Sequence, residues 1–281
     1  MIAKRSNSIY MYQKEKIMKE ETDARDAPMF NQSIEKGLAI LVAFGSNGRS
    51  MSMSQIAEAV GITRSSAQRV VFTLEALGYL VKDPFTRRYE LANKVMEIGC
   101  NYLEAHPLIE RANPILSAAN SACDESVSLT EACGIHMVYV ATFTSRKPIV
   151  AHMPIGSRMP MYCTAAGRAY LSGLPDDEVM AILEREDRKQ YTVHTKTDIQ
   201  QIFATVQEAR VRGYSTNYEE YYLGHMNVGA PVFNNSGTVV AAVNLVAPSS
   251  RWAAEDLTAK LGPMLLDCAR AITNAARTHR A

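Results

Sequence analysis

The chain has 281 residues, with 30 lysines and arginines against 29 aspartates and glutamates, and 47% of its residues are hydrophobic. This composition excludes a disordered chain, a fibre and a membrane-spanning protein. The length suits two domains, each large enough to bury its own core. Five cysteines without a C-x-x-C pair are typical of reduced thiols, and residues 1–29 hold no apolar leader, so we expect a cytoplasmic protein with no membrane partner.

The first third of the chain reads as a tail followed by a small helical domain. Residues 1–29 mix charges with few large aliphatic side chains, which predicts a mobile tail. From Ser33, the expected N-cap of the first helix, apolar residues recur at helical spacing. Gly61 should end the second helix, and Thr63 should cap the third. The expected elements are helices at 33–44, 54–60 and 64–77 and short strands at 79–82 and 88–91.

Two helices joined by a turn at Gly61, and then a hairpin, are typical of a winged helix-turn-helix whose second helix enters the major groove of DNA. Arginine can bind guanine or phosphate, glutamine can pair with adenine, and hydroxyl groups reach phosphates. A single module of this kind binds DNA weakly, so we expect a dimer on double-stranded operator DNA. The candidate DNA-binding residues are Thr63, Arg64, Ser65, Ser66, Gln68 and Arg69 on the helix and Arg87 and Arg88 on the wing.

The remaining two thirds of the chain alternate strand and helix patterns. A helix over 92–104 can link the first domain to the rest. Strands interleaved with helices over about 170 residues describe an α+β or α/β domain. The expected strands are 126–130, 137–142, 149–152, 228–233 and 239–246, and the expected helices are 108–123, 165–172, 176–184, 198–212 and 253–278.

Specific runs of residues resemble the IclR-type bacterial transcription regulators over about Asn31 to Arg277. They are SIEKGLAILVAF, MSQIAEAVGITRSSAQRVVFTLEALGYLVKD, PIGSRMPMYCTAAGRAYLSGLP and RGYSTNYEEYYLGHMNVGAPVFNNSGTVVAAVNLVAPSSRW. The resemblance implies an α+β fold with a winged helix-turn-helix over 30–91, a linker helix over 92–106, and a GAF-like effector-binding domain over 107–281 built on a six-stranded antiparallel sheet. It also implies homodimers or homotetramers.

The resemblance further implies a cup in the C-terminal domain that binds an effector. The corresponding positions are Met159, Ala165, Ala166, Asn217, His225, Asn227, Asn244 and Val246. Asparagine stands at 217, 227 and 244, where better-known members carry an acid, a Cys or Ser, and a Ser. Neutral amides can orient a carboxylate, a phenol or a carbonyl. We therefore expect an aromatic or other catabolic acid, with apolar wall from Met153, Met159, Met161 or Tyr162.

Other residues favour ordinary structural roles. The histidines and cysteines lack metal-ligand spacing, so we expect no metal and no cofactor. The tyrosines at 218, 221 and 222 favour packing, and adjacent Glu219 and Glu220 should face opposite sides and so cannot act together. No nucleophile elbow or phosphate-binding loop appears, so we expect a regulator and not an enzyme. An enzymatic or purely structural C-terminal domain, and a helical module that only packs or dimerises, are the alternatives.

Overall fold

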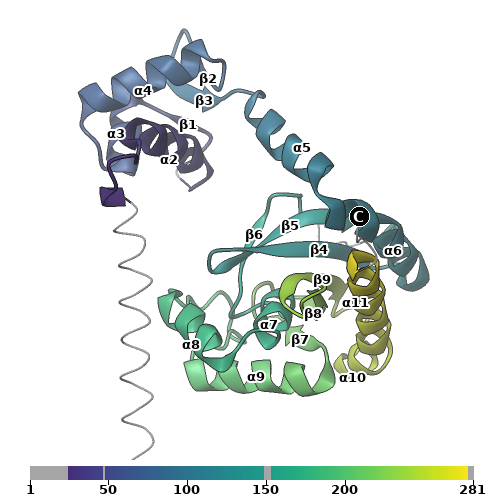
Figure 1. Cartoon of the computed structure of the whole chain (residues 1–281). Helices are drawn as coiled ribbons and strands as arrows, with labels where there is room; N and C mark the ends of the chain where they lie inside the picture. Colours follow the sequence, from purple (N-terminus) through teal and green to yellow (C-terminus); the bar gives the residue numbers. More distant parts are fainter. Residues whose placement is uncertain (1–24, 47, 149–152, 278–281) are drawn as a thin grey trace, which may run out of the picture. The chain divides into compact units, whose positions relative to one another are not determined.

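The computed structural model describes residues 25–46, 48–148 and 153–277. The chain divides into two compact units at Ala105 and His106, and each unit is treated by itself (Figure 1). Residues 1–24 of the predicted tail and the predicted strand at 149–152 lie outside the described residues. In the described part of the chain, every helix is too short or too polar to cross a membrane.

The first unit is a small helical module with a short sheet, followed by helix α5. In chain order it contains α2 (Gln32–Ser46), β1 (Ser50–Met51), α3 (Met53–Val60), α4 (Arg64–Ala76), β2 (Leu80–Lys82), β3 (Tyr89–Leu91) and α5 (Val95–Ala105). The three predicted helices and the hairpin are confirmed. The two-residue strand β1, which pairs with the far edge of β3, was not predicted. The centre of the apolar core of the first unit is formed by Ile40, Phe44, Ile56, Val71 and Leu80.

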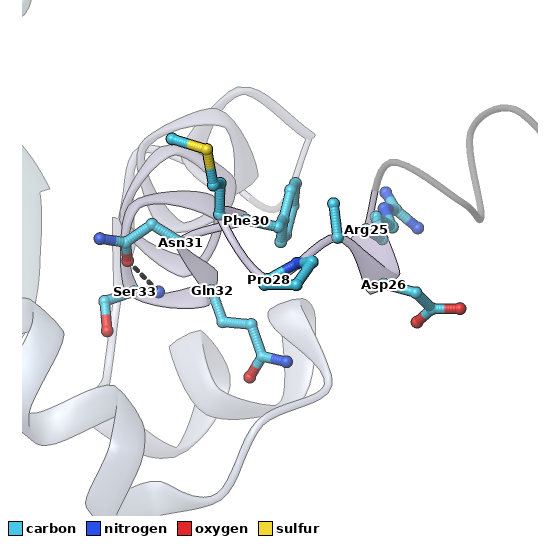
Figure 2. Close-up of a pocket in the computed structure, with 9 residues that line it drawn as sticks. Arg25, Asp26, Pro28, Phe30, Asn31, Gln32 and Ser33 are labelled. Carbon is cyan, nitrogen blue, oxygen red and sulfur yellow. Dashed lines mark hydrogen bonds between the residues drawn. The ribbon is translucent and has the colours of Figure 1, made fainter.

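Local capping explains where the helices begin and end. Ser52 and Gln55 form a reciprocal capping box at the start of α3, and Gly61 ends that helix in the left-handed conformation. Thr63 caps α4 as predicted, since its side chain accepts from the Ser66 N–H. The N-cap prediction for α2 was wrong, because Asn31 Oδ1 accepts from the N–H groups of Ser33 and Ile34 at 3.0 and 3.2 Å (Figure 2).

The second unit is built on a six-stranded antiparallel sheet of order β6-β5-β4-β9-β8-β7. Its helices are α6 (Pro107–Cys123), α7 (Ala165–Ser172), α8 (Asp176–Arg185), α9 (Ile199–Arg212), α10 (Ala254–Asp256), the π-helix η1 (Leu257–Leu261) and α11 (Gly262–Arg277). Its strands are β4 (Ser126–Cys133), β5 (His136–Phe143), β6 (Arg158–Pro160), β7 (Ser215–Tyr218), β8 (His225–Phe233) and β9 (Val239–Pro248).

Helices cover both faces of this sheet. Helices α6 and α11 contact each other and pack on β4, β5, β8 and β9, whereas α7 packs on β7, β8 and β9 and is itself covered by α9 (Figure 1). The predicted α+β class, the winged helix-turn-helix and the six-stranded sheet are confirmed. The single helix predicted over 253–278 was wrong in detail, because a π-helical turn interrupts it before Gly262. A Cβ at Gly262 would lie 2.6 Å from the Tyr214 ring, so a side chain at this position would force that ring to shift.

Candidate functional site

The N-terminal half of α4 presents the predicted DNA-binding side chains on one exposed face. Arg64, Ser65, Gln68 and Arg69 are exposed, whereas Ala67, Val71 and Leu74 are buried in the core. Ser66 is half-buried, and the Thr63 hydroxyl is occupied in capping the helix. Because the helix is anchored by its apolar face and its cap, its polar face is held in one orientation suited to a groove of DNA.

The wing between β2 and β3 is a hydrogen-bonded turn, and the two predicted wing arginines after it have different surroundings. Asp83 Oδ1 accepts from the N–H groups of Phe85 and Thr86 at 2.9 and 2.6 Å, and these bonds hold the pKa of Asp83 below its ordinary value. Arg87, in the left-handed conformation with φ 59°, is exposed beside this turn. The Arg87 side chain is therefore accessible on the wing.

Arg88 corrects the expectation that both wing arginines extend along a DNA backbone. Its Nε donates to Ser50 Oγ at 2.9 Å, and its Nη2 donates to the Ser50 carbonyl at 2.7 Å and to Gln55 Oε1 at 2.9 Å. The half-buried guanidinium thus ties the wing to β1 and to the start of α3. Because Arg88 follows Arg87 in the sequence, both side chains were expected to face solvent. The hydrogen bonds to Ser50 of β1, a strand that was not predicted, turn Arg88 inward instead.

In the second unit, all eight predicted effector positions line one cavity on the α7 face of the sheet. Strand register explains why residues so distant in sequence meet. Asn217 on β7 lies opposite Asn227 on β8, and Asn227 lies opposite Val246 on β9, so these three form one row on one face. Asn244 lies two residues before Val246 and therefore faces the same side.

The first turn of α7 closes one side of the cavity, where Ala165 and Ala166 lie. A glycine makes this possible, because a Cβ at Gly229 of β8 would lie 2.3 Å from the Ala165 carbonyl oxygen. Thr164 caps the helix by accepting from the Gly167 N–H. The N–H groups of Ala165 and Ala166 have no carbonyl partner within the helix, and a helix N-terminus favours negative charge.

The three predicted amides have different surroundings. Asn217 Nδ2 donates to the Cys163 carbonyl at 2.8 Å, and its Oδ1 accepts from the Glu220 N–H at 3.3 Å, so both ends of this side chain hold neighbouring segments. Asn244 Nδ2 donates to the phenol oxygen of Tyr139 at 3.1 Å. Half-buried Asn227 stands between them on β8 and lines the cavity.

Two titratable groups of the cavity wall, Tyr139 and His225, are neutral at physiological pH because burial shifts their pKa values. Burial raises the pKa of the Tyr139 phenol, so it keeps its proton. Burial lowers the pKa of His225, and the nearby Glu219 carboxylate only partly opposes this effect. Among the described residues that line the cavity there is no lysine or arginine. An anion bound here would therefore be held by neutral donors and the α7 N-terminus.

The sequence analysis missed four lining residues: Tyr139, Thr164, Tyr221 and Tyr222. The sequence favoured a packing role for Tyr221 and Tyr222. Their rings do pack against each other, with centroids 4.6 Å apart in an edge-on contact. These two tyrosines lie shortly after Gly213, Tyr214 and Asn217 in the sequence, and this position could have identified them as lining residues. Of the expected apolar wall, Met153 and Met159 line the cavity, whereas Met161 and Tyr162 are buried in the core beneath α7 instead.

A second hollow, at the start of α2, carries no such arrangement. It is lined by residues 25–33, a single continuous segment whose side chains are almost all exposed (Figure 2). The side chains of Arg25, Pro28 and Gln32 point away from one another around it. Because it brings together no residues from distant parts of the chain, we assign no site there.

Comparisons with known proteins agree with this architecture. The family model described as the IclR helix-turn-helix domain matches residues 33–84, and that of the bacterial transcriptional regulator IclR C-terminal domain matches residues 100–274. The Pca regulon regulatory protein of Pseudomonas putida is 31% identical over 244 residues, which are 86% of this chain and 83% of the relative.

Solved structures give the same result. A transcriptional regulator from Rhodococcus sp. RHA1 is 34% identical with a TM-score of 0.74, and the match covers 88% of this chain and 98% of that one. An IclR homolog of Microbacterium hydrocarbonoxydans, solved with 4-hydroxybenzoate, shares the fold at 18% identity and a TM-score of 0.69, covering 88% of this chain and all (100%) of the other.

The fold and the exposed face of α4 define a transcription regulator that binds DNA through a helix-turn-helix and carries a second, separately folded domain. With family models matching both parts of the sequence, the chain belongs to the IclR family of bacterial transcriptional regulators.

Proposed function

We propose that this protein is a transcription regulator whose affinity for operator DNA is controlled by a small organic acid bound in the second unit. The observation that carries the proposal is the cavity itself. Polar groups from β5, β8 and β9 and the N-terminus of α7 meet there, next to apolar side chains. A concave, mostly apolar site with a few converging polar groups is the usual form of a small-molecule site.

The chemistry of the wall favours an aromatic or other catabolic acid. The N–H groups of Ala165 and Ala166 suit a carboxylate. Tyr139 accepts from Asn244, so its own O–H is left to donate toward the cavity. Met153, Met159 and the rings of Tyr221 and Tyr222 offer apolar contact. A structural neighbour was solved with a ligand of this class, 4-hydroxybenzoate.

The cavity has a volume of about 30 Å³. One buried water requires about 10–15 Å³ of such space. The cavity therefore has room for a few water molecules but not for an aromatic ring. We therefore propose that an acid of this size enters with a movement of the wall. Of the described residues that line the cavity, Tyr222, between β7 and β8, has the most exposed side chain, at 48%.

Regulation then requires that ligand binding in one unit changes DNA binding in the other. We propose that the linker over residues 92–106 transmits this change by altering the spacing of two recognition helices in a dimer. Dimer formation through the first unit is supported by Ile34, Leu38 and Val42, which lie on α2 with side chains 56–69% exposed. By linkage, ligand and operator must alter each other's affinity by the same factor, about 5–150-fold.

The test is a thermal-shift screen of the purified full chain against aromatic and aliphatic acids, followed by operator gel shifts with each hit. A ligand at about 100 times its Kd stabilises the folded state by about 2.7 kcal/mol, which a melting curve resolves. We expect benzoate-like acids to raise the melting temperature and to change operator affinity. Preference for glyoxylate or pyruvate would refute the ligand class, and chemical consumption of the ligand would instead indicate an enzyme.

A further inference from the structure

A buried ion pair lies directly behind the cavity wall. Arg168 on α7 and Glu220, after β7, are each about 1% exposed. Their contact is bidentate, with Nη1 to Oε1 at 2.6 Å and Nη2 to Oε2 at 2.7 Å. Lys196 adds its backbone N–H at 3.0 Å and its Nζ at 3.2 Å to the same carboxylate. Burial alone would raise the pKa of Glu220, but these partners outweigh it and lower the pKa.

This ion pair closes a ring of polar contacts around the cavity wall. Arg168 Nε donates to the Tyr162 carbonyl at 2.9 Å, and Asn217 Nδ2 donates to the carbonyl of the next residue, Cys163, at 2.8 Å. The Glu220 N–H donates to Asn217 Oδ1, which completes the circuit. We call Tyr162, Cys163, Arg168, Asn217 and Glu220 the polar ring. It joins the loop before α7, α7 itself and the end of β7.

Further hydrogen bonds hold the main chain at Glu220. Thr192 Oγ1 donates to the Glu219 carbonyl at 2.6 Å, and Thr195 Oγ1 donates to the Glu220 carbonyl at 2.6 Å. Glu219 itself is held in the left-handed conformation with φ 55°. Tyr221 and Tyr222, which follow Glu220 in the chain, line the cavity. The tyrosines are therefore attached directly to the part of the chain that the polar ring fixes.

We infer that the Arg168–Glu220 pair is a positioning element for the cavity. It holds Tyr221 and Tyr222 at a set distance from the N-terminus of α7, and so determines the shape into which a ligand must fit. A buried arginine–carboxylate pair adds little net stability compared with an apolar pair, but its bidentate geometry restricts orientation. Neither Arg168 nor Glu220 lines the cavity, so both act on a ligand through other residues.

The same domain contains a matched control. Glu125, also about 1% exposed, receives Arg251 through two contacts of 2.8 Å and the Trp252 indole N–H at 2.8 Å. This second buried pair joins the start of β4 to the segment after β9. Glu125, Arg251 and Trp252 do not line the cavity. If buried ion pairs only stabilise the domain, neutralising either carboxylate should have the same consequences.

The experiment compares the full-length wild type with E220Q, R168K and E125Q by hydrogen-exchange mass spectrometry without ligand. We expect E220Q and R168K to raise the exchange rate of residues 219–224 by about tenfold or more, the factor for losing one hydrogen bond to a charged group. We expect E125Q to leave that segment unchanged and to raise exchange near Ser126 instead. Unchanged protection of residues 219–224 in E220Q and R168K, or equal loss in E125Q, would overturn the inference.

A second arm measures the Kd of 4-hydroxybenzoate for the same proteins by calorimetry. This arm rests on the proposed function, and we expect binding to weaken about tenfold in E220Q while E125Q stays within about twofold of the wild type. If the wild type does not bind this probe, the proposed ligand class fails, whereas the exchange arm still decides the positioning role. If E220Q does not fold, R168K decides the question, because Glu220 then keeps its contacts with Lys196.

Discussion

The side-chain amide of Asn244 on β9 donates a hydrogen bond to the phenol oxygen of Tyr139 on β5, two strands away. Each residue lines the cavity, and each is almost fully buried. Because the phenol oxygen accepts this bond, the phenol O–H is not used in it and can donate to another group. Burial raises the pKa of Tyr139, which keeps that proton in place at physiological pH.

Tyr139→Phe should therefore weaken binding of an organic acid by about 1–2 kcal/mol, because it removes one donor and leaves the Asn244 amide without its acceptor. Calorimetric titration with 4-hydroxybenzoate measures the change. Tyr218→Phe is the matched control, since the Tyr218 hydroxyl contacts Thr258 Oγ1 at 2.8 Å and lies outside the cavity wall. Equal affinity losses in the two variants would contradict this role for Tyr139.

The exposed arginines of α4 should carry operator recognition. Arg64→Ala or Arg69→Ala should weaken operator binding by about 1–3 kcal/mol where the side chain contacts a base. Arg87→Ala on the wing should lower affinity evenly across DNA sequences and reduce the salt slope by about one. Gel shifts at several salt concentrations measure both effects, with Arg270→Ala, an exposed arginine on α11, as the control. Wild-type affinity in all three variants would reject the docking model.

Arg88 should behave differently from its neighbour. Arg88→Ala removes three hydrogen bonds to Ser50 and Gln55, so we expect the first unit to lose about 1–3 kcal/mol of stability. Arg87→Ala should leave stability nearly unchanged, because the Arg87 side chain is exposed. Thermal unfolding of the two variants makes the comparison. A stable Arg88→Ala protein with weakened DNA binding would restore the interpretation that this residue contacts phosphate.

Close packing of α7 on β8 should make Gly229 intolerant of any side chain. The added methyl of Gly229→Ala would approach the Ala165 carbonyl at 2.3 Å, which forces α7 away from the sheet. We expect a loss of about 1–3 kcal/mol or more, together with loss of ligand binding. Gly99→Ala on α5 meets no atom within 4 Å and should instead stabilise by up to about 1 kcal/mol. Differential scanning calorimetry distinguishes the two outcomes.

The buried carboxylates predict how stability depends on pH. Burial opposes ionisation of Glu125 and Glu220, yet their arginine partners outweigh burial and lower both pKa values. A lowered pKa in the folded state gives stability that is present above the unfolded-state value, about 4.3, and is lost as pH falls through the folded value. The melting-temperature difference between the wild type and E220Q should thus shrink below about pH 4.3. A constant difference down to pH 3 would contradict the ionised pair.

Local signals in the sequence determined the first unit. Gly61 ends α3 and Thr63 begins α4. A left-handed glycine and a capping hydroxyl act within a few residues of their own position, so the sequence reveals them directly. The apolar period then identified which face of α4 is buried and which is exposed. The cavity residues came from the family resemblance, and strand register shows how Asn217, Asn227 and Val246 come to share one face.

Only the tertiary structure decided what those residues contact. Arg168 and Glu220 stand 52 positions apart in two separate motifs, and nothing local indicates that they pair. Likewise, Arg88 turns inward because β1, too short to leave a periodic pattern, supplies its acceptor. Capping and periodicity depend on residues within one or two helical turns. Ion pairs, cavity walls and short edge strands depend on which distant segments the core brings together, and that information lies in packing and not in spacing along the chain.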